Sequence, residues 1–393
     1  MDVYEESLKL HKKHQGKLET TGIVQITSKQ DLAIYYTPGV AEPSRQIAKD
    51  KTLSFDLTLR GRTIAVISDG SAVLGLGNIG AEAALPVMEG KSLLLKKFGG
   101  VDSFPLVIHV RTPEEIIHFV RDVVPTFAGI LLEDIAAPKC FQIEEQLQDL
   151  GIPVFHDDQH GTAIVVSAAL RNAAKVVGKP FESLNVVIVG AGAAGLAVAR
   201  MLLGLNCAED RCDRLPGSRS VSEVIVVDSK GALYSGRDGQ NIYKQAVAGL
   251  SNKQRKSGPL EEVIKNADAV VGVSGPNTIT KEMVASMADK AIVFAMANPI
   301  PEIMPDDAKE AGAFVIATGR SDFPNQINNV LAFPGIFKAV VKGRLKTITH
   351  EMKEAAVDAI ANLVPNPTQE SIIPDLFHPG LAEKISEAIL KVK

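Results

Sequence analysis

The run Asn185-Val-Val-Ile-Val-Gly190-Ala-Gly192-Ala-Ala-Gly195 decides the fold of the second half of this 393-residue chain. A short β-branched run passes directly into Gly-x-Gly-x-x-Gly and then into a helical pattern, as in dinucleotide-binding turns. Such glycines permit a tight turn, and backbone N–H groups at the helix start bind a pyrophosphate. We therefore expect Gly190, Gly192, Ala193, Ala194 and Gly195 to contact a nucleotide. The alternative is a turn that serves helix–sheet packing alone.

The next β-branched run ends at Asp228, an acid that can accept hydrogen bonds from both ribose hydroxyls. It lies 38 residues after Gly190 because a polar, turn-rich insertion, Cys207–Ser222, intervenes. A carboxylate here would repel a 2′-phosphate. Asp228 thus favours NAD over NADP, although the neighbouring Lys230 keeps NADP possible.

Two further glycine turns occur in the chain. Gly272-Val-Ser274-Gly275 follows a β-branched run, and we expect it to pass under the cofactor with Ser274 in contact. Gly75-Leu-Gly77-Asn-Ile-Gly80 is separated from its strand, and no acid ends the strand that follows. It is interpreted as a tight loop that either brings backbone close to a small ligand or serves packing.

From about residue 60, β-branched runs alternate with helical patterns, which predicts an α/β fold with parallel sheets. The apolar helix Gly161–Val177 is long enough to join two domains. We expect an N-terminal α/β substrate- and metal-binding domain over residues 1–160. A Rossmann-like dinucleotide-binding domain with C-terminal helices is expected over residues 161–393. The predicted strands are Thr63–Ser68, Pro105–Val110, Gly129–Leu132, Pro153–His156, Asn185–Val189, Glu223–Val227, Ala269–Val273, Ala291–Ala295 and Ala313–Ala317.

The composition argues against nucleic acid or a membrane as the main partner. The net charge is −4, aromatic residues make up 5% and tryptophan is absent. No apolar run is long enough to span a bilayer, and the N-terminus lacks a leader pattern, so a soluble cytoplasmic protein is expected. The three cysteines do not form a disulfide framework. We expect free thiols at Cys140, Cys207 and Cys212, half a metal knuckle at the last two being the weaker alternative.

Acidic residues stand where three predicted strands of the first domain end. They are Asp69, the pair Glu133–Asp134 and the pair Asp157–Asp158. Carboxyl ends of neighbouring parallel strands face one crevice, where converging carboxylates repel unless a cation neutralises them. Oxygen ligands favour Mg²⁺ or Mn²⁺, and Glu133, Asp134 and Asp158 are the candidates. The alternative is that these acids cap the helices that follow.

Six motifs, in chain order, resemble those of the malic enzymes in their short prokaryotic form. They are YTPGVAEP (Tyr36–Pro43), SDGSAVLGLGNIG (Ser68–Gly80), LLED (Leu131–Asp134), FHDDQHGTA (Phe155–Ala163), ANPIPEI (Ala297–Ile303) and NQINNVLAFPG (Asn325–Gly335). The resemblance implies oxidative decarboxylation of L-malate to pyruvate and CO2, with NAD(P), a divalent metal and a homodimer.

The resemblance also implies roles for single residues. Lys91 matches the family's base, which needs a depressed pKa, and Tyr36 matches its general acid. Asp157 matches a residue that adjusts the charge of the lysine. Asn298, beside the cofactor, and Asn328 match asparagines that bind the substrate carboxylates. The candidate metal ligands match as well.

One departure concerns the substrate. Where larger relatives carry an arginine that grips a malate carboxylate, this chain has Ser71-Ala72-Val73. We expect backbone N–H groups of the Gly75–Gly80 loop, or another residue, to replace it. An alternative activity is a malolactic-type lyase that keeps NAD tightly bound and releases lactate. A third is a nucleotide-binding regulatory protein with a decayed site, which the presence of Tyr36, Lys91 and the acids argues against.

Overall fold

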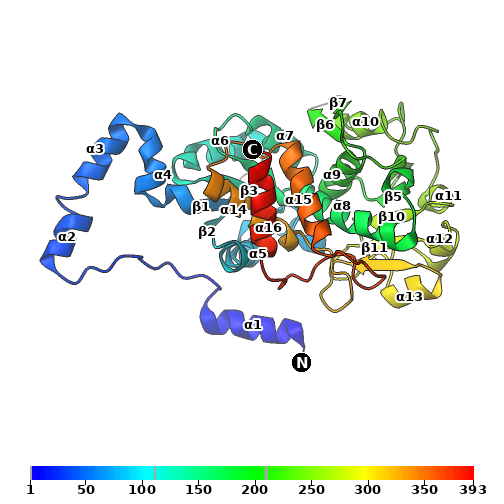
Figure 1. The fold of residues 1–393 in the computed structure, drawn as a ribbon, viewed down its shortest axis with the longest axis horizontal. Coiled ribbons are helices and arrows are strands. Elements are labelled where there is room, and N and C mark those ends of the chain that lie inside the picture. Colours follow the sequence, from blue (N-terminus) through cyan, green and yellow to red (C-terminus); the bar gives the residue numbers. More distant parts are fainter. Residues whose placement is uncertain (1, 110–111, 209–210) are drawn as a thin grey trace.

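The computed structural model describes residues 2–109, 112–208 and 211–393. These residues form an N-terminal arm and two α/β units, the first and the second in chain order, each built on a largely parallel sheet (Figure 1). The first sheet is fully parallel, with the order β2-β1-β3-β4. Its strands are β1 (Thr63–Ser68), β2 (Asp102–Val107), β3 (Gly129–Leu132) and β4 (Val154–His156). The expected strand Pro105–Val110 is thus observed three residues earlier, and Val110 lies outside the described residues.

The second sheet has the order β12-β11-β10-β5-β8-β9, with only β9 antiparallel. Side chains of β5 alternate, so that Val186 and Ile188 belong to one apolar core and Val187 and Val189 to another. Burial on both faces explains why this strand is apolar at successive positions. The strands are β5 (Asn185–Val189), β8 (Glu223–Asp228), β9 (Gly231–Ala232), β10 (Ala269–Gly272), β11 (Ile292–Ala295) and β12 (Val315–Thr318).

Helices connect and cover these strands. The longer ones of the first unit are α5 (Ala81–Leu94), which continues as a π-helical turn η4 (Leu95–Gly99), α6 (Pro113–Val123) and α7 (Lys139–Gln146). The second unit has α9 (Ala193–Leu202) and the shorter helices α10 (Ile242–Ala248), α11 (Leu260–Val263), α12 (Lys281–Ala285) and α13 (Pro305–Glu310). Local sequence explains where α6 begins, because Thr112 and Glu115 form a capping box and Pro113 occupies the first turn of the helix.

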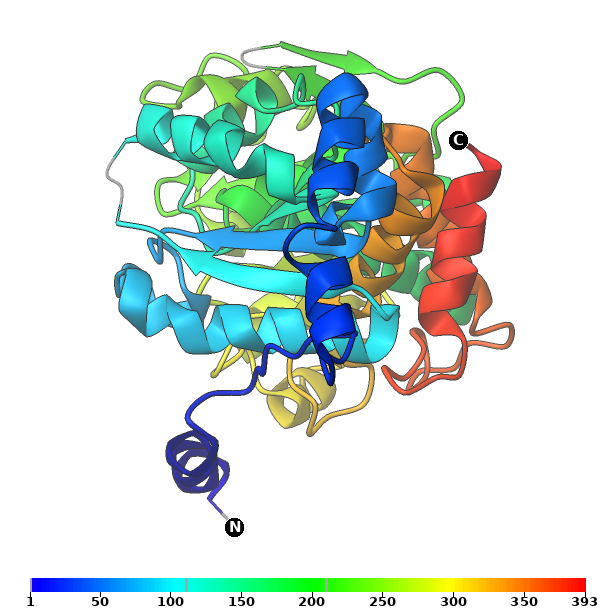
Figure 2. The same cartoon turned by 90° about the vertical axis from the view of Figure 1, so that its left-hand side faces the viewer.

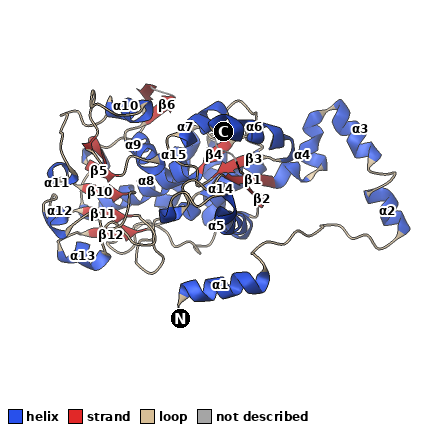
Figure 3. Cartoon of the chain, turned by 180° about the vertical axis from the view of Figure 1, so that it is seen from behind, coloured by secondary structure: helices blue, strands red, loops and turns tan. Residues whose placement is uncertain are grey.

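One long helix, α8 (Asp157–Val177), lies between the two sheets and packs against α9 (Figure 3). Of the C-terminal helices α14 (Phe333–Gly343), α15 (His350–Asn362) and α16 (Leu381–Lys391), the last packs against both others, and α14 also contacts β3. The end of the chain therefore returns to the first sheet. The division at residue 160 stays a prediction, and α8 begins four residues before the expected Gly161.

The N-terminal arm stands away from both units (Figure 1), and its first helix is also seen apart from the body in Figure 2. Its helices α1 (Val3–His14), α2 (Lys29–Tyr35) and α3 (Ala41–Lys49) have no buried residue. The backbone N–H of Lys17 donates to Glu89 on α5, which attaches the arm to the body. A short helix α4 (Ser54–Leu57) leads into β1. Within the described chain, none of the helices combines the length and apolarity needed to cross a membrane.

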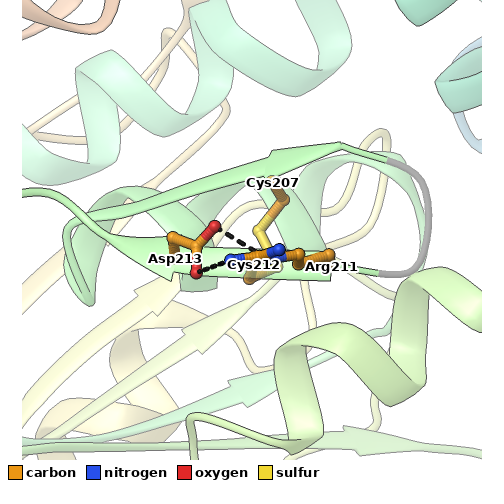
Figure 4. Close-up of a disulfide and its surroundings, with 4 residues drawn as sticks. All are labelled: Cys207, Arg211, Cys212 and Asp213. Atoms are coloured by element: carbon orange, nitrogen blue, oxygen red, sulfur yellow. Dashed lines mark hydrogen bonds and ion pairs between the residues drawn. A yellow bond between two sulfur atoms is a disulfide. The ribbon is translucent and has the colours of Figure 1, made fainter.

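The polar insertion contains structure that the sequence did not predict. β6 (Leu205–Ala208) and β7 (Arg211–Arg214) pair antiparallel, and Cys207 stands opposite Cys212. The two cysteines form a disulfide (Figure 4). The expectation of free thiols is therefore wrong for this pair, because strand pairing brings the two Cα atoms to 4.0 Å. Cys140 is free and buried, as expected.

Candidate active site

A cavity of about 600 Å³ lies where the carboxyl ends of both sheets meet. The first unit contributes the loop after β1, α5 and the acids after β3 and β4. The second contributes the start of α9 and the loops after β10, β11 and β12. Among the predicted residues, Lys91, Glu133, Asp134, Asp158, Ala194, Ser274, Asn298 and Asn328 line it. Tertiary structure thus gathers residues from across almost 240 positions of sequence.

Lys91 lines this cavity from near the C-terminal end of α5. Its Nζ donates to Oδ2 of Asp157 at 2.6 Å and lies 2.9 Å from Oε1 of Glu133. Burial lowers the pKa of Lys91, but the carboxylates of Asp157, Glu133 and neighbouring Asp158 outweigh burial and raise it. The expected depressed pKa is contradicted, because the sequence did not show that three acids surround one ammonium.

Three acids form a cluster beside Lys91. One oxygen from each of Glu133, Asp134 and Asp158 lies within 4.8 Å of the others. Oε2 of Glu133 and Oδ2 of Asp134 are buried without a hydrogen-bond partner. Burial and the charge of Asp158 raise the pKa of Asp134 to about 7. Burial also raises the pKa of Glu133, although the nearby positive charge of Lys91 acts to lower it. These unmatched oxygens fit the donor set of a hard divalent cation.

The first turn of α8 holds Asp157 and Asp158 in place. Asp157 is fully buried, and Oδ2 of Asp158 accepts the backbone N–H of Asp134 at 2.9 Å. Glu144 on α7 braces the same turn by accepting hydrogen bonds from the His156 backbone at 3.1 Å and from His160. The ion pair with His160 is among the contacts that hold the pKa of Glu144 at about 2, against its burial.

Asp69 does not join the cluster. Its Oδ2 pairs with Lys139, and its Oδ1 accepts the backbone N–H of Ser71 at 3.1 Å. Asp69 therefore stabilises the loop after β1 and does not cap a helix, which was the alternative for these acids. It was also not among the three candidate metal ligands.

The dinucleotide turn has the close approaches that require glycine. A Cβ on Gly195 would lie 1.8 Å from the carbonyl oxygen of Gly190, and one on Gly190 would lie 2.5 Å from that of Val273. Gly190 also has a positive φ of 116°. Gly192 is the N-cap of α9, and no side chain bonds to the N–H groups there. These groups can therefore receive an anion.

Asp228 ends β8 as predicted, but its charge is already matched. Arg237 Nη2 lies 2.6 Å and Lys244 Nζ 2.7 Å from its Oδ2, and the backbone N–H of Lys230 donates to Oδ1. Burial raises the pKa of Asp228, but these partners outweigh it and hold the pKa below the usual range. The sequence missed Arg237 and Lys244, which lie nine and sixteen residues downstream in no recognisable motif.

The amide side chains of the substrate end lie on two loops. Asn298 follows β11, and Asn328 caps the turn η7 (Asn329–Leu331), where its Oδ1 accepts the Val330 N–H at 3.0 Å. Two polar residues that line the cavity were missed, Thr162 on α8 and Asn329. The neighbouring asparagines in the sequence were a usable signal for Asn329.

No arginine lines the cavity in the part of the chain that the structure describes, where Lys91 is its one cationic side chain. Leu74 and Gly75 of the glycine loop do line it. A Cβ on Gly75 would lie 2.3 Å from the carbonyl oxygen of Asn298. The backbone of this loop therefore packs against the second unit, as the packing interpretation of the Gly75–Gly80 loop expected.

Tyr36 lies outside the cavity of its own chain. It follows α2 on the arm and is 65% exposed, next to Tyr35 at 50%. Neither tyrosine is among the residues that line the cavity around Lys91. The structure thus brings together every predicted residue of the substrate and metal ends except Tyr36.

Sequence comparison finds two family matches. Residues 15–115 match the malic enzyme N-terminal domain, and residues 159–392 match the malic enzyme NAD-binding domain. The chain is 51% identical to the bifunctional malic/malolactic enzyme of Bacillus subtilis, over 100% of this chain and 93% of that protein. It is 47% identical to the NAD-dependent malic enzyme of Geobacillus stearothermophilus, over 96% and 76%.

Solved structures give the same result. The NAD-dependent malic enzyme of Thermotoga maritima superposes with a TM-score of 0.91 at 44% identity, covering 98% of both chains. The malic enzyme of Pyrococcus horikoshii gives 0.91 at 44%, covering 99% of this chain and 90% of that one.

Proposed function

Because this chain belongs to the malic enzyme family and is an NAD(P)-dependent malic enzyme, we propose that L-malate is oxidised and decarboxylated in the cavity around Lys91. The products are pyruvate and CO2. The observation that carries this assignment of the site is the position of the Lys91 ammonium, which contacts both Asp157 and the acid cluster.

The acids Glu133, Asp134 and Asp158 would hold Mg²⁺ or Mn²⁺. Their oxygens lie close together, and two of them are buried without a hydrogen-bond partner. A bound cation would neutralise the repulsion between these carboxylates. When bound, the cation supplies a Lewis acid for the oxygen on C2 of the substrate.

In the cation-free site Lys91 is held as an ammonium, and a divalent cation on Glu133, Asp134 and Asp158 would offset the acids that raise its pKa, so that Lys91 could release a proton to solvent. As the neutral amine, Lys91 would then take the proton of the C2 hydroxyl while the nicotinamide serves as hydride acceptor. Its Nζ is fixed by Asp157 and Glu133, and it lies 4.6 Å from the centre of the Phe333 ring. Asp157 orients the amine and has no solvent exposure. Asn298 and Asn328 would donate hydrogen bonds to the substrate carboxylates, in place of the absent arginine.

Product analysis tests this function against the malolactic alternative, which the similarity to the bifunctional Bacillus subtilis enzyme makes specific. Protein incubated with malate, NAD and Mn²⁺ should form pyruvate and free NADH in equal amounts, and EDTA should stop the reaction. Lactate without free NADH would establish the lyase instead. No turnover with any pairing of cofactor and metal would reject both.

NAD is proposed as the preferred cofactor, with NADP also accepted. Asp228 supports NAD because a carboxylate at the ribose opposes a 2′-phosphate. Arg237 and Lys244 reduce this opposition because they pair with the same carboxylate and could turn to a phosphate. The preference should therefore be modest.

Replacing Lys244 by alanine should weaken NADP binding about tenfold and leave NAD binding within about twofold, since one charge-assisted contact is lost. Dissociation constants of both cofactors, measured by calorimetry, check this. Lys230→Ala is the matched control, because only the backbone N–H of Lys230 is seen to bond Asp228. An equal loss for both cofactors would show that Lys244 merely supports Asp228.

Stabilisation by Mn²⁺ should increase with pH. The pKa of Asp134 is raised to about 7, so its proton competes with a cation in acidic solution. Because folded Asp134 binds its proton more tightly than the unfolded chain does, this proton stabilises the cation-free fold. The stabilisation is fully present below about pH 4 and is lost as the pH rises through about 7. Melting temperatures after EDTA treatment should therefore fall over that range. The gain on adding Mn²⁺ should be larger at pH 8 than at about pH 5.5, and an equal gain at both would contradict the proposed ligands.

We also place the protein in the cytoplasm as a homodimer whose arms complete the sites. The arm exposes large apolar side chains, including Tyr4 at 75%, Ile23 at 80% and Ile34 at 54%. Such a surface is typical of an interface. Tyr36 lies on this arm, away from the cavity of its own chain. Tyr36 of the partner subunit would then supply the proton to C3 of the enolate after decarboxylation.

A further inference from the structure

Glu302 is a fully buried acid that the mechanism above does not use. It lies in the segment after β11, and its side chain packs against the end of β10. Gly272 makes room for it, because a Cβ there would lie 2.5 Å from Cδ of Glu302. A larger residue at position 272 would therefore displace the side chain of Glu302.

The carboxylate of Glu302 joins two loops. Oε1 accepts the backbone N–H of Ser274 at 2.8 Å, and Oε2 accepts that of Ala297 at 2.9 Å. The first N–H belongs to the loop after β10 and the second to the loop after β11. The main-chain carbonyl of Glu302 also accepts the N–H of Ile279 at 3.0 Å.

Packing alone does not account for an acid here. Across the described ranges, no lysine, arginine or histidine forms an ion pair with Glu302, and its charge is met by the two backbone N–H groups and by the Ser274 hydroxyl, which donates to Oε1 at 3.4 Å. Burying a carboxylate without a cation is unfavourable, and an apolar side chain would fill the same space without that cost but would leave the two N–H groups without an acceptor. What a carboxylate adds is two acceptors in one plane, able to hold two N–H groups at a fixed separation.

Both loops reach the cavity, since Ser274 and Asn298 line it. Gly75 of the first unit abuts the carbonyl of Asn298, so the second loop also contacts the other half of the site. We propose that Glu302 is a positioning residue that locks these loops together and so sets the nicotinamide and substrate end of the site. This inference rests on the proposed function, in which Ser274 and Asn298 face cofactor and substrate.

The test compares Glu302→Gln with a matched control, Asp268→Asn. Asp268 is also buried and also accepts a backbone N–H, that of Asn185 at 2.8 Å. It immediately precedes β10 and so lies at the opposite end of the strand from the cavity. Both variants lose a buried carboxylate, but only one loses it beside the site.

Binding of ADP-ribose and of NAD separates the two halves of the cofactor. Glu302→Gln should bind ADP-ribose within about twofold of the native chain, bind NAD about fivefold more weakly and raise the KM for malate about tenfold. Asp268→Asn should change neither the ratio of the two affinities nor the KM. Gly272→Ala, which leaves the carboxylate but displaces it, should reproduce the Glu302→Gln pattern and serves if that variant does not fold.

A Glu302→Gln or Gly272→Ala protein with a lower melting temperature but native KM, kcat and affinity ratio would overturn the positioning role. The binding comparison needs neither malate nor metal. Failure of the native chain to turn over malate would therefore refute the proposed function while the affinity ratio still decides the role of Glu302.

Discussion

Replacing Lys91 by alanine should lower kcat for malate oxidation about 1000-fold, because the group that accepts the hydroxyl proton is removed. NAD affinity should stay within about twofold, since the proposed phosphate and ribose contacts are at the end of β5, the start of α9 and the end of β8, away from Lys91. Initial rates of NADH formation and a fluorescence titration with NAD measure the two effects.

Stability needs its own control for this variant. The alanine leaves Asp157, which is fully buried, without the ammonium that donates to it, and an uncompensated buried charge is destabilising. Lys91→Arg keeps the cation but cannot serve as a base near neutral pH. It should retain a near-native melting temperature with the same loss of rate. A Lys91→Ala protein within about tenfold of the native kcat would remove Lys91 from its proposed role.

Mixing two inactive variants should restore activity if the arm of each subunit completes the active site of its partner. Tyr36→Phe and Lys91→Ala each disable both sites of their own dimer. In a hybrid dimer, one site combines native Lys91 with the partner's native Tyr36, and the other site carries both substitutions. Random reassembly at equal amounts should recover about one quarter of the native sites, because half of the dimers are hybrids with one intact site each.

The recovery should exceed either parent by about 100-fold, which makes this effect easy to separate from residual rates. Mass spectrometry of the mixture verifies that hybrids have formed. If hybrids form and activity does not return, then Tyr36 serves the cavity of its own chain. A monomeric protein with native activity would also refute the shared site.

The local elements followed closely from the sequence where burial is continuous. β1, β3 and β5 have the predicted bounds, because β-branched runs buried on both faces leave little ambiguity. β2 shifted by three residues, and its side chains are mostly only partly buried, so its pattern is weaker. The β6–β7 hairpin was missed because its residues are mainly polar.

The candidate site was predicted as a set of residues, and its geometry was not. Motif resemblance pointed to Lys91 and the acid cluster, whose roles remain proposals. The raised pKa of Lys91 depends on the 2.6 and 2.9 Å contacts with Asp157 and Glu133, which no spacing reveals. The partners of Asp228 were equally hidden, and they weaken the expectation of NAD further than Lys230 alone did, to a modest preference.

By itself, the sequence determined which segments become the parallel strands of the two sheets and which of their ends carry glycines or acids, because those features depend on neighbours along the chain. Only the tertiary structure decided that Asp69 pairs away from the acid cluster, that Glu302 joins two loops and that Tyr36 stands apart on an exposed arm. The physical reason is that charge compensation and completion of a cavity depend on groups brought close in space, and local pattern carries no record of which distant groups those will be.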